Sequence, residues 1–154
     1  WYLSNPLLDG ITLSGGEPFL QVKPLKILVS QIKAQTSLHI MIYSGYVYED
    51  ILKLGQDAID LLSLCDTLVD GRFVLSLRSL ELIYKGSSNQ RIIDIHKSLQ
   101  QGRVYEQQVS EDGELIDWIN SLLFIKVILL YNKKDKEGKY EAIIMFWCWW
   151  YIKR

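Results

Sequence analysis

Three short apolar runs, each ending in a polar or glycine-containing turn, most constrain what this 154-residue chain can fold into. The runs cover residues 10–14, 38–43 and 66–69, and they close on Ser14-Gly15-Gly16-Glu17, Ser44-Gly45-Tyr46 and Asp70-Gly71-Arg72. Between them, apolar residues recur at helical spacing over 22–34 and 49–64, and Gly55 is expected to divide the second helix. Strands that alternate with helices predict a parallel sheet with right-handed crossovers, which is an α/β fold.

The three turns are predicted to share one edge of the sheet. Parallel strands place their carboxyl ends together, and ligands of α/β sheets bind at that end. In the first turn Gly15 and Gly16 lack Cβ atoms, so a ligand can come close to the backbone and positive φ is available. Glu17 adds a carboxylate, and Pro18 fixes the exit of the chain. The convergence of these turns predicts a single ligand site.

After residue 72 the pattern is looser. A polar turn covers residues 85–91, and residues 91–95 form a possible fourth strand. Residues 120–154 contain two apolar runs on either side of the charged segment 132–139, which predicts a β-hairpin with a charged loop.

The last part of the chain also differs in composition. Residues 120–154 carry a net charge of +4 and eight of the 18 aromatic residues, whereas residues 1–119 carry a net charge of −5. The segment 146–151 is aromatic on both faces, so it is expected to be buried, to bind something or to aggregate. A composition break therefore lies near residue 120.

Composition argues against several function classes. A net charge of −1 gives no global field that would favour nucleic acid or a membrane surface. The apolar run 142–152 is far shorter than the roughly 20 residues that a membrane-spanning helix needs. Two widely spaced cysteines do not make a disulfide framework, which favours a reduced, cytoplasmic setting.

The cysteines and histidines are predicted to be structural. Cys65 and Cys148 are expected to pack as small apolar residues. His39 and His96 stand without the partners that a metal site needs. No metal ligands are predicted.

Four motifs, in this order and at these spacings, carry a resemblance to a known family. They are Ile11 to Pro18 with its Gly-Gly-Glu-Pro turn, Tyr43-Ser44-Gly45-Tyr46, Leu68-Val69-Asp70-Gly71-Arg72-Phe73 and Gly86-Ser87-Ser88-Asn89-Gln90-Arg91. Together they resemble the activating proteins of anaerobic (class III) ribonucleoside-triphosphate reductases, which are radical S-adenosylmethionine (SAM) enzymes. The resemblance covers roughly residues 5–105, so it implies a radical-SAM-like α/β domain over residues 1–110 and a divergent extension over residues 111–154. The Gly-Ser-Ser-Asn-Gln-Arg string is its family-specific part, whereas the Gly-Gly-Glu-Pro turn is common to the superfamily.

The resemblance implies a partial TIM-type barrel with parallel strands, incomplete here, followed by the hairpin-like extension. It implies SAM and a [4Fe-4S] cluster as cofactors. In such enzymes reductive cleavage of SAM yields a radical that generates a glycyl radical on the reductase. The implied partners are the large subunit of the anaerobic reductase and an electron donor such as flavodoxin or ferredoxin, with no nucleic acid and no membrane.

The resemblance also implies where SAM binds. Gly15, Gly16 and Glu17 would hold the methionyl amine, and Ser44 and Gly45 would lie at the next strand end. The remaining implied residues are Asp70 and Arg72 in the SAM cleft, and Asn89, Gln90 and Arg91 at the border of the cleft or of the partner peptide.

The chain departs from the family in its cysteines. The family holds its cluster with three cysteines spaced C-x3-C-x2-C, and SAM fills the fourth coordination position. No such triplet is present, and only fourteen residues precede Gly15. We therefore expect the body of an activating protein without its cluster-binding start, unable to cleave SAM. Such a body would lack a strand, and the open parallel edge predicts marginal stability.

Two other functions stay open. The first is a non-catalytic module that binds SAM, a related nucleotide or the reductase. The second is a generic phosphate- or nucleotide-binding α/β domain. The second is disfavoured because no glycine-rich phosphate loop with a lysine follows a strand.

The implied site residues also have structural interpretations. The Gly-Gly-Glu-Pro sequence alone is an ordinary strand-to-helix turn, and Ser44-Gly45 can be a plain turn. Asp70 can cap a helix, and Arg72 can pair with a nearby acid. Asn89 and Gln90 can hold a loop together through hydrogen bonds from side chain to backbone.

Overall fold

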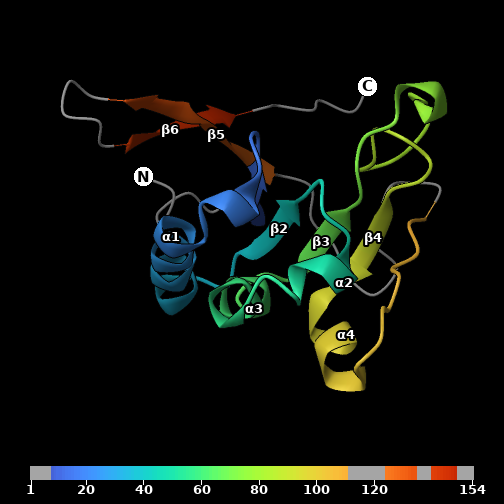
Figure 1. Ribbon diagram of the computed structural model, residues 1–154, viewed down its shortest axis with the longest axis horizontal. Helices are drawn as coiled ribbons and strands as arrows, with labels where there is room; N and C mark the ends of the chain where they lie inside the picture. The colour runs from blue at the N-terminus through green and yellow to red at the C-terminus, as the bar shows by residue number, and fades with distance from the viewer. Residues whose placement is uncertain (1–7, 111–123, 135–139, 149–154) are drawn as a thin grey trace.

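A six-stranded sheet organises the part of the chain that the computed structural model describes, which is residues 8–110, 124–134 and 140–148. Its strands are β1 (Gly10–Ser14), β2 (His39–Tyr43), β3 (Thr67–Asp70), β4 (Arg91–Asp94), β5 (Phe124–Lys134) and β6 (Tyr140–Cys148). The helices are α1 (Val22–Gln35), α2 (Tyr48–Ile51), α3 (Gln56–Ser63) and α4 (Ile95–Gln101), with two 3-10 turns, η2 (Pro18–Leu20) and η3 (Leu75–Leu77). The predicted α/β class is confirmed, because strands and helices alternate from β1 to β3 (Figure 1).

The strands lie in the order β4-β3-β2-β1-β5-β6. β1, β2 and β3 are parallel neighbours, as predicted, with Leu13 beside Ile42 and Ile42 beside Leu68. The prediction of parallel strands is wrong for β4, which runs antiparallel to β3 with Asp70 opposite Arg91. A parallel neighbour needs a long crossover, usually a helix, to bring the chain back to the starting edge. Residues 71–90 contain only the short turn η3, so the chain re-enters the sheet from the edge that it has just left.

The hairpin predicted near the end of the chain is confirmed. β5 and β6 pair antiparallel, from Ile125 opposite Cys148 to Lys134 opposite Tyr140. β5 also runs parallel to β1, with residues 124–128 beside residues 10–14. The edge of β1 that was expected to be open is therefore covered by β5. The domain boundary near residue 110 stays a prediction.

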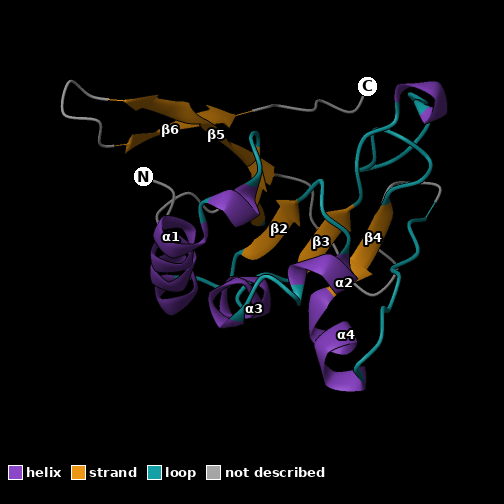
Figure 2. Cartoon of the chain, viewed as in Figure 1, coloured by secondary structure: helices purple, strands orange, loops and turns teal. Residues whose placement is uncertain are grey.

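The sheet has one face covered by helices and one face with a smaller apolar cluster. Figure 2 shows α1, α3 and α4 on the same side of β1 to β4. Because alternate residues of a strand point to opposite faces, Leu13 and Ile42 belong to the main core beneath these helices. Met41, Val69 and Ile92 form the second cluster on the other face. The fold thus leaves the strand ends, and not the faces, as the places where turns gather.

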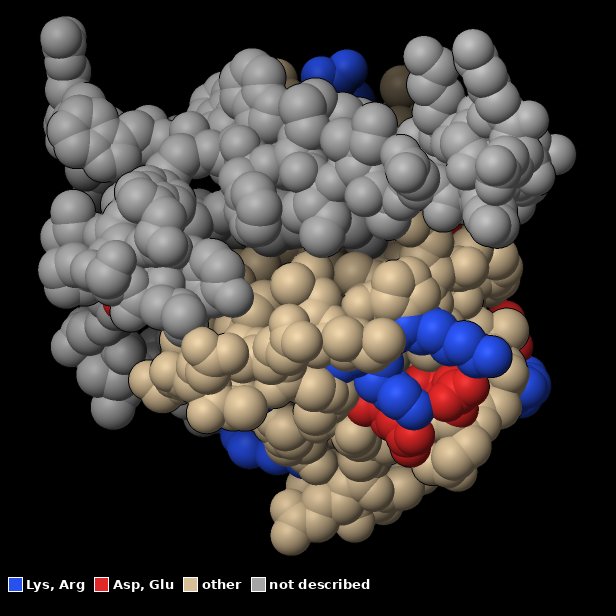
Figure 3. Space-filling view, turned by 90° about the vertical axis from the view of Figure 1, so that its left-hand side faces the viewer, with Lys and Arg blue, Asp and Glu red and all other residues tan. Residues whose placement is uncertain are grey.

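The helices are short and are held by local signals. Gly55, at a φ of 110°, separates α2 from α3, which confirms the predicted break. Lys26 of α1 contacts Asp57 and Asp60 of α3 at 2.7 and 2.9 Å. Figure 3, which views the molecule from the side of α1, shows acidic and basic side chains gathered together among uncharged residues in the described part of this face. Among the described helices, none has the length and apolar character needed to cross a membrane.

Candidate functional site

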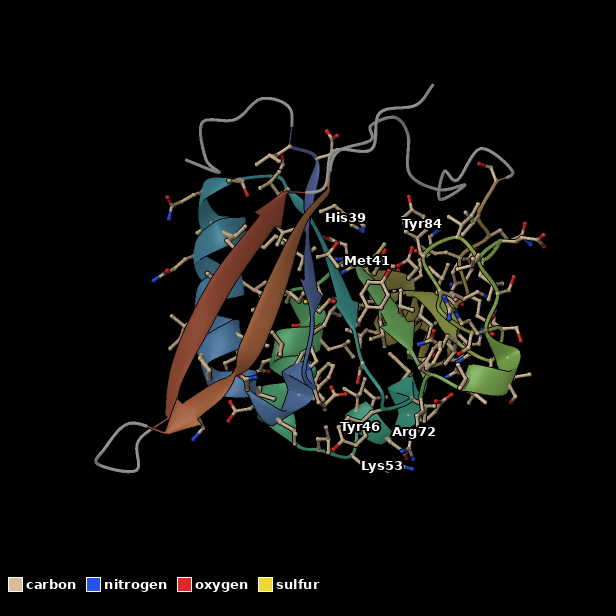
Figure 4. All side chains as sticks on the ribbon, turned by 90° about the horizontal axis from the view of Figure 1, so that it is seen from above. His39, Met41, Tyr46, Lys53, Arg72 and Tyr84 are labelled. Carbon is tan, nitrogen blue, oxygen red and sulfur yellow. The ribbon has the colours of Figure 1, made fainter. Side chains whose placement is uncertain are left out.

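The turns that follow β1, β2 and β3 meet at the carboxyl edge of the sheet, as the sequence predicts. The backbone joins the second and third turns, because Ser44 N donates to Val69 O and Gly71 N donates to Tyr46 O, each over 3.0 Å. In Figure 4 the side chains of Tyr46 and Arg72 lie close together at this edge, whereas His39 marks the opposite, amino edge. The sheet therefore has two separate edges that carry polar groups.

Glu17 ties the first turn to the second. Its Oε1 accepts hydrogen bonds from the Ser44 hydroxyl over 2.9 Å and from Phe19 N over 3.1 Å. Its Oε2 accepts from Gly45 N over 2.8 Å. The buried Ser44 hydroxyl in turn accepts from Tyr46 N over 3.0 Å. A carboxylate offers about four lone-pair sites, so these three donors leave Glu17 with capacity for one further donor.

Glycines keep the backbone of both turns accessible. Gly15 and Gly16 have φ values of 92° and 50°, which lie in a region that residues other than glycine rarely adopt. Gly16 is exposed, as is Gly45 in the second turn. A Cβ at Gly45 would lie 3.4 Å from Glu17 Oε2, so glycine also lets the carboxylate approach. The geometry brings together Gly15, Gly16, Glu17, Ser44 and Gly45, and their contact with SAM stays a prediction.

Asp70 is held by structural partners. It is only 1% exposed, and its Oδ2 accepts from Tyr48 N over 2.7 Å while its Oδ1 accepts from Arg91 Nε over 3.0 Å. Arg91 also bridges to Glu49, at 3.1 Å from Nη1 to Oε1 and 2.8 Å from Nη2 to Oε2. The hydrogen bonds from Arg91 lower the pKa of Glu49. Asp70 therefore caps the first turn of α2 and fixes the start of β4, and its contact with SAM stays a prediction.

Asn89 and Gln90 hold the connection between β3 and β4. Gln90 Nε2 donates to Gly71 O over 2.9 Å, and Gln90 Oε1 accepts from Gly86 N over 2.8 Å. Asn89 Nδ2 donates to Arg72 O over 2.8 Å. The loop-holding interpretation of both amides is confirmed. A role of theirs at the cleft stays a prediction, as does that of Arg91.

Arg72 differs from Arg91 in having its charge available. Arg91 has two carboxylate partners, whereas no acidic side chain of the described residues pairs with Arg72. Its side chain is exposed at the carboxyl edge beside Tyr46 (Figure 4). An uncommitted guanidinium can bind a carboxylate through two parallel hydrogen bonds. Arg72 is thus a cationic group that this edge can offer to an anionic ligand.

A second carboxylate cluster lies at the amino edge, and the sequence reasoning missed it. Asp66, just before β3, accepts from Lys33 Nζ and from Ile40 N through Oδ2, each over 2.6 Å. Its Oδ1 lies 3.1 Å from His96 Nε2. Burial opposes ionisation of Asp66, but these hydrogen bonds outweigh it and the pKa of Asp66 is lowered. The signal that could have identified Asp66 is its position directly before a buried strand. The sequence reasoning also missed Glu49, whose signal is its position in a helix that follows a strand.

His39 has a structural role at this edge, as predicted. It is 1% exposed, and its Nε2 lies 2.9 Å from Thr67 Oγ1. Because the Thr67 hydroxyl donates its proton to Gln107 Oε1 over 3.1 Å, His39 Nε2 is the donor to Thr67. Burial lowers the pKa of His39 to about 4, so the ring is neutral at pH 7.

The described residues do not fit a [4Fe-4S] cluster. Cluster ligands are cysteine thiolates. Cys65 is fully buried, its thiol donates to Leu61 O over 3.4 Å, and burial raises its pKa. The second cysteine, Cys148, lies at the end of β6. In the part of the chain that the structure covers, no group of three or more His, Cys, Asp or Glu residues could hold a metal ion.

SAM, in contrast, fits the carboxyl edge. Its methionyl part carries an ammonium, which needs acceptors, and a carboxylate, which needs donors. Glu17 retains acceptor capacity beside the open backbone of Gly15 and Gly16. Arg72 supplies a donor of the opposite charge at the same edge. The donor set therefore suits the two charges of an amino acid.

Comparison with known proteins confirms the resemblance. The family model described as "4Fe-4S single cluster domain" matches residues 2–93. The anaerobic ribonucleoside-triphosphate reductase-activating protein of Escherichia coli strain K12 is 37% identical over 85 residues, 53% of either chain. The protein of that name from Enterobacteria phage T4 is 34% identical over 94 residues, which are 59% of this chain and 56% of the phage protein. The protein of that name from Haemophilus influenzae is 33% identical over 87 residues, 54% of either chain. This chain thus spans about half the length of the curated relatives it matches. No solved structure gives a significant match.

Proposed function

Since the chain belongs to the 4Fe-4S single cluster domain family and is similar to activating proteins of anaerobic ribonucleoside-triphosphate reductases, we propose that it binds SAM as part of such an activating activity. The proposed site is the carboxyl edge of the sheet, where the turns after β1, β2 and β3 meet. The observation that carries the proposal is the bridge from Glu17 to Ser44 and Gly45, because it joins two of the resembling motifs into one surface.

Glu17 has two tasks in this proposal. Its three structural hydrogen bonds fix the carboxylate against the turn after β2, directly after Gly15 and Gly16 in the chain. Its remaining lone pair, together with backbone carbonyls of the turn, accepts from the methionyl ammonium. The ammonium is thereby oriented by a carboxylate that is already fixed, so little side-chain entropy is lost on binding.

Arg72 complements Glu17 by binding the methionyl carboxylate. Asp70 does not compete for Arg72, because Arg91 and the amide of Tyr48 already occupy its carboxylate. Ser44 and Gly45 place the second turn against the first, and Asn89 holds the backbone of Arg72 in place. When bound and reductively cleaved, SAM supplies a carbon-centred radical. We assign no step to an iron–sulfur cluster on the residues described.

The reductase is the proposed partner. Radical generation on a glycine of the large subunit requires that subunit to meet the SAM-binding edge. A flavodoxin or a ferredoxin is the proposed source of the electron. These partners, and a cytoplasmic setting, come to the chain through its resemblance to the activating proteins.

SAM binding by the purified chain tests the proposal. Isothermal titration calorimetry is expected to give one site per chain, and Glu17→Ala is expected to weaken binding at least about tenfold, since a charged hydrogen bond is lost. Glu81→Ala is the matched control, because Glu81 is an exposed glutamate outside the three turns. Equal affinities for the wild type and Glu17→Ala would overturn the assignment of this edge.

A second function is a module that binds SAM, a nucleotide or the reductase without redox chemistry. The burial of Cys65 and its bond to Leu61 favour it, because they leave this thiol unsuited to bind iron. Iron and sulfide analysis after anaerobic reconstitution, with the electron paramagnetic resonance spectrum, separates the two functions. SAM binding without stoichiometric iron supports the module. About four irons per chain, together with a reduced-cluster signal that SAM alters, would exclude the module. The cluster would then need both cysteines or other groups as ligands.

A further inference from the structure

The connection between β3 and β4 exposes several large apolar side chains in one short stretch. Residues 73–80, here called the leucine loop, include Phe73 at 50%, Leu75 at 72%, Leu77 at 43% and Leu80 at 86% exposure. Figure 1 shows this connection, with η3 at its tip, standing away from the sheet on the side opposite α4. Single exposed leucines are common on protein surfaces, but contiguous exposed apolar groups mark interaction sites.

The leucine loop is held in place by its own hydrogen bonds. The buried Ser87 accepts from Val74 N through its hydroxyl over 3.2 Å and pairs with Arg78 in an isolated antiparallel bridge. Ser88 N donates to Leu77 O over 2.9 Å. The leucines therefore stay exposed on a fixed backbone.

The far end of the connection is anchored to the sheet. The hydroxyl of Tyr43, the last residue of β2, donates to Tyr84 O over 2.7 Å. Tyr84 has a φ of 61°, and it is the one residue other than glycine with positive φ in the described chain. A residue other than glycine is strained in this region, and such residues cluster at functional sites. The strain indicates that the course of this connection serves more than chain reversal.

The surroundings of the leucines are cationic. Arg72 precedes the loop, Arg78 lies within it and Lys85 follows it, and none of the three has an acidic partner among the described residues. Glu81 is the one acidic residue between positions 71 and 90. The whole chain, in contrast, has a net charge of −1. An occupant of this surface must therefore combine large apolar side chains with negative charge.

We propose that the leucine loop docks an apolar, acidic segment of a partner polypeptide, which under the proposed function is a segment of the reductase. Leucines 75, 77 and 80 would supply the apolar contact, and Arg78 and Lys85 would pair with acidic side chains of that segment. The loop directly follows Arg72, which lies at the carboxyl edge, so a segment seated on it lies beside the proposed SAM site. The inference rests on the proposed function for the identity of the partner.

Binding of the full chain to the purified anaerobic reductase of the same genome tests the proposal. The double variant Leu75→Ser and Leu80→Ser is expected to weaken binding at least about tenfold, since exposed anchors dominate such interfaces. Arg78→Glu is expected to weaken binding as well and to reverse part of its salt dependence. The matched control is Leu20→Ser with Ile27→Ser, because these residues are 75% and 63% exposed on η2 and α1, away from the loop.

The outcomes are distinguishable from failure of the proposed function. Calorimetry on every variant is expected to give unchanged SAM affinity and unchanged folding by circular dichroism, since the substituted side chains are exposed. If the loop variants bind the reductase as the wild type does, the docking proposal is overturned while SAM binding stands. If they instead change the sedimentation coefficient of the chain alone, the surface is a contact between copies, and the proposal is likewise overturned. If the wild type binds neither SAM nor reductase, the proposed function itself fails.

Discussion

At both edges of the sheet a carboxylate joins separate segments of the chain, but the groups around the two carboxylates differ. The carboxylates are those of Glu17 at the carboxyl edge and Asp66 at the amino edge. Asp66 takes its donors from Lys33, from His96 and from the amide of Ile40, so side chains surround it. Glu17 takes its donors from a serine hydroxyl and two backbone amides of short turns, and no cation of the described residues pairs with it.

The difference shows which edge can accept a ligand. At the amino edge a lysine balances the carboxylate, and a buried neutral histidine lies beside it, so the cluster is internally complete. At the carboxyl edge the glycine turns leave the backbone exposed, and Arg72 keeps an unbalanced charge. Carboxylates that look alike in a sequence therefore differ in function through the donors that surround them.

The largest expected effect is on the stability of the carboxyl edge. Asp70→Ala should destabilise the chain by about 3–5 kcal/mol, because it leaves Arg91 and the amide of Tyr48 without a buried acceptor. Asp50→Ala, in α2, the helix that Asp70 caps, removes an exposed carboxylate that pairs with Lys53 and should cost about 0.5 kcal/mol or less. Urea unfolding measures both. Similar losses for the two variants would contradict the structural role of Asp70.

Acid should weaken the amino edge. The pKa of His39 is lowered from 6.5 to about 4, so the folded state binds fewer protons than the unfolded state between these values. The contribution of the neutral His39 ring to the free energy of unfolding is therefore fully present above pH 6.5. It is lost as the pH falls toward 4, and the total loss is about 3 kcal/mol. Asp66 and Asp94 favour protonation of the ring and Lys33 and His96 oppose it, but burial is the largest influence and lowers the pKa of His39.

Unfolding free energies measured from pH 7 to pH 4 test this expectation. The decline should shrink in His39→Gln and persist in His96→Gln, since His96 is exposed. A flat profile in the wild type would show that His39 is not the neutral, buried ring described.

The smallest expected effect on stability belongs to Arg72→Gln. Because no described acid pairs with this exposed side chain, the free energy of unfolding should change by less than about 0.5 kcal/mol. SAM affinity should nevertheless fall about tenfold, because a charged hydrogen bond to the methionyl carboxylate is lost. Lys23→Gln, an exposed cation on α1, should change neither quantity. A loss of stability without a loss of affinity would make Arg72 structural.

Periodicity predicted the fold as far as local patterns reach. The strand runs and the break at Gly55 are local signals, and the structure has them at β1 to β3 and between α2 and α3. The direction of β4 was not predictable in the same way, because direction depends on whether a crossover helix forms in residues 71–90. The pairing of β5 with β1 joins segments more than 100 residues apart, and no local pattern records it.

The sequence by itself determined that glycine turns and polar residues follow three parallel strands, and so that they meet at one edge. Order along the chain is enough for that conclusion, since parallel strands share their carboxyl ends. Only the tertiary structure decided which polar groups remain available there. Asp70 binds Arg91 and Gln90 binds Gly71, whereas no acid in the described part of the chain pairs with Arg72. A hydrogen-bond donor has few protons and an acceptor few lone pairs, so availability depends on neighbours that folding alone brings together.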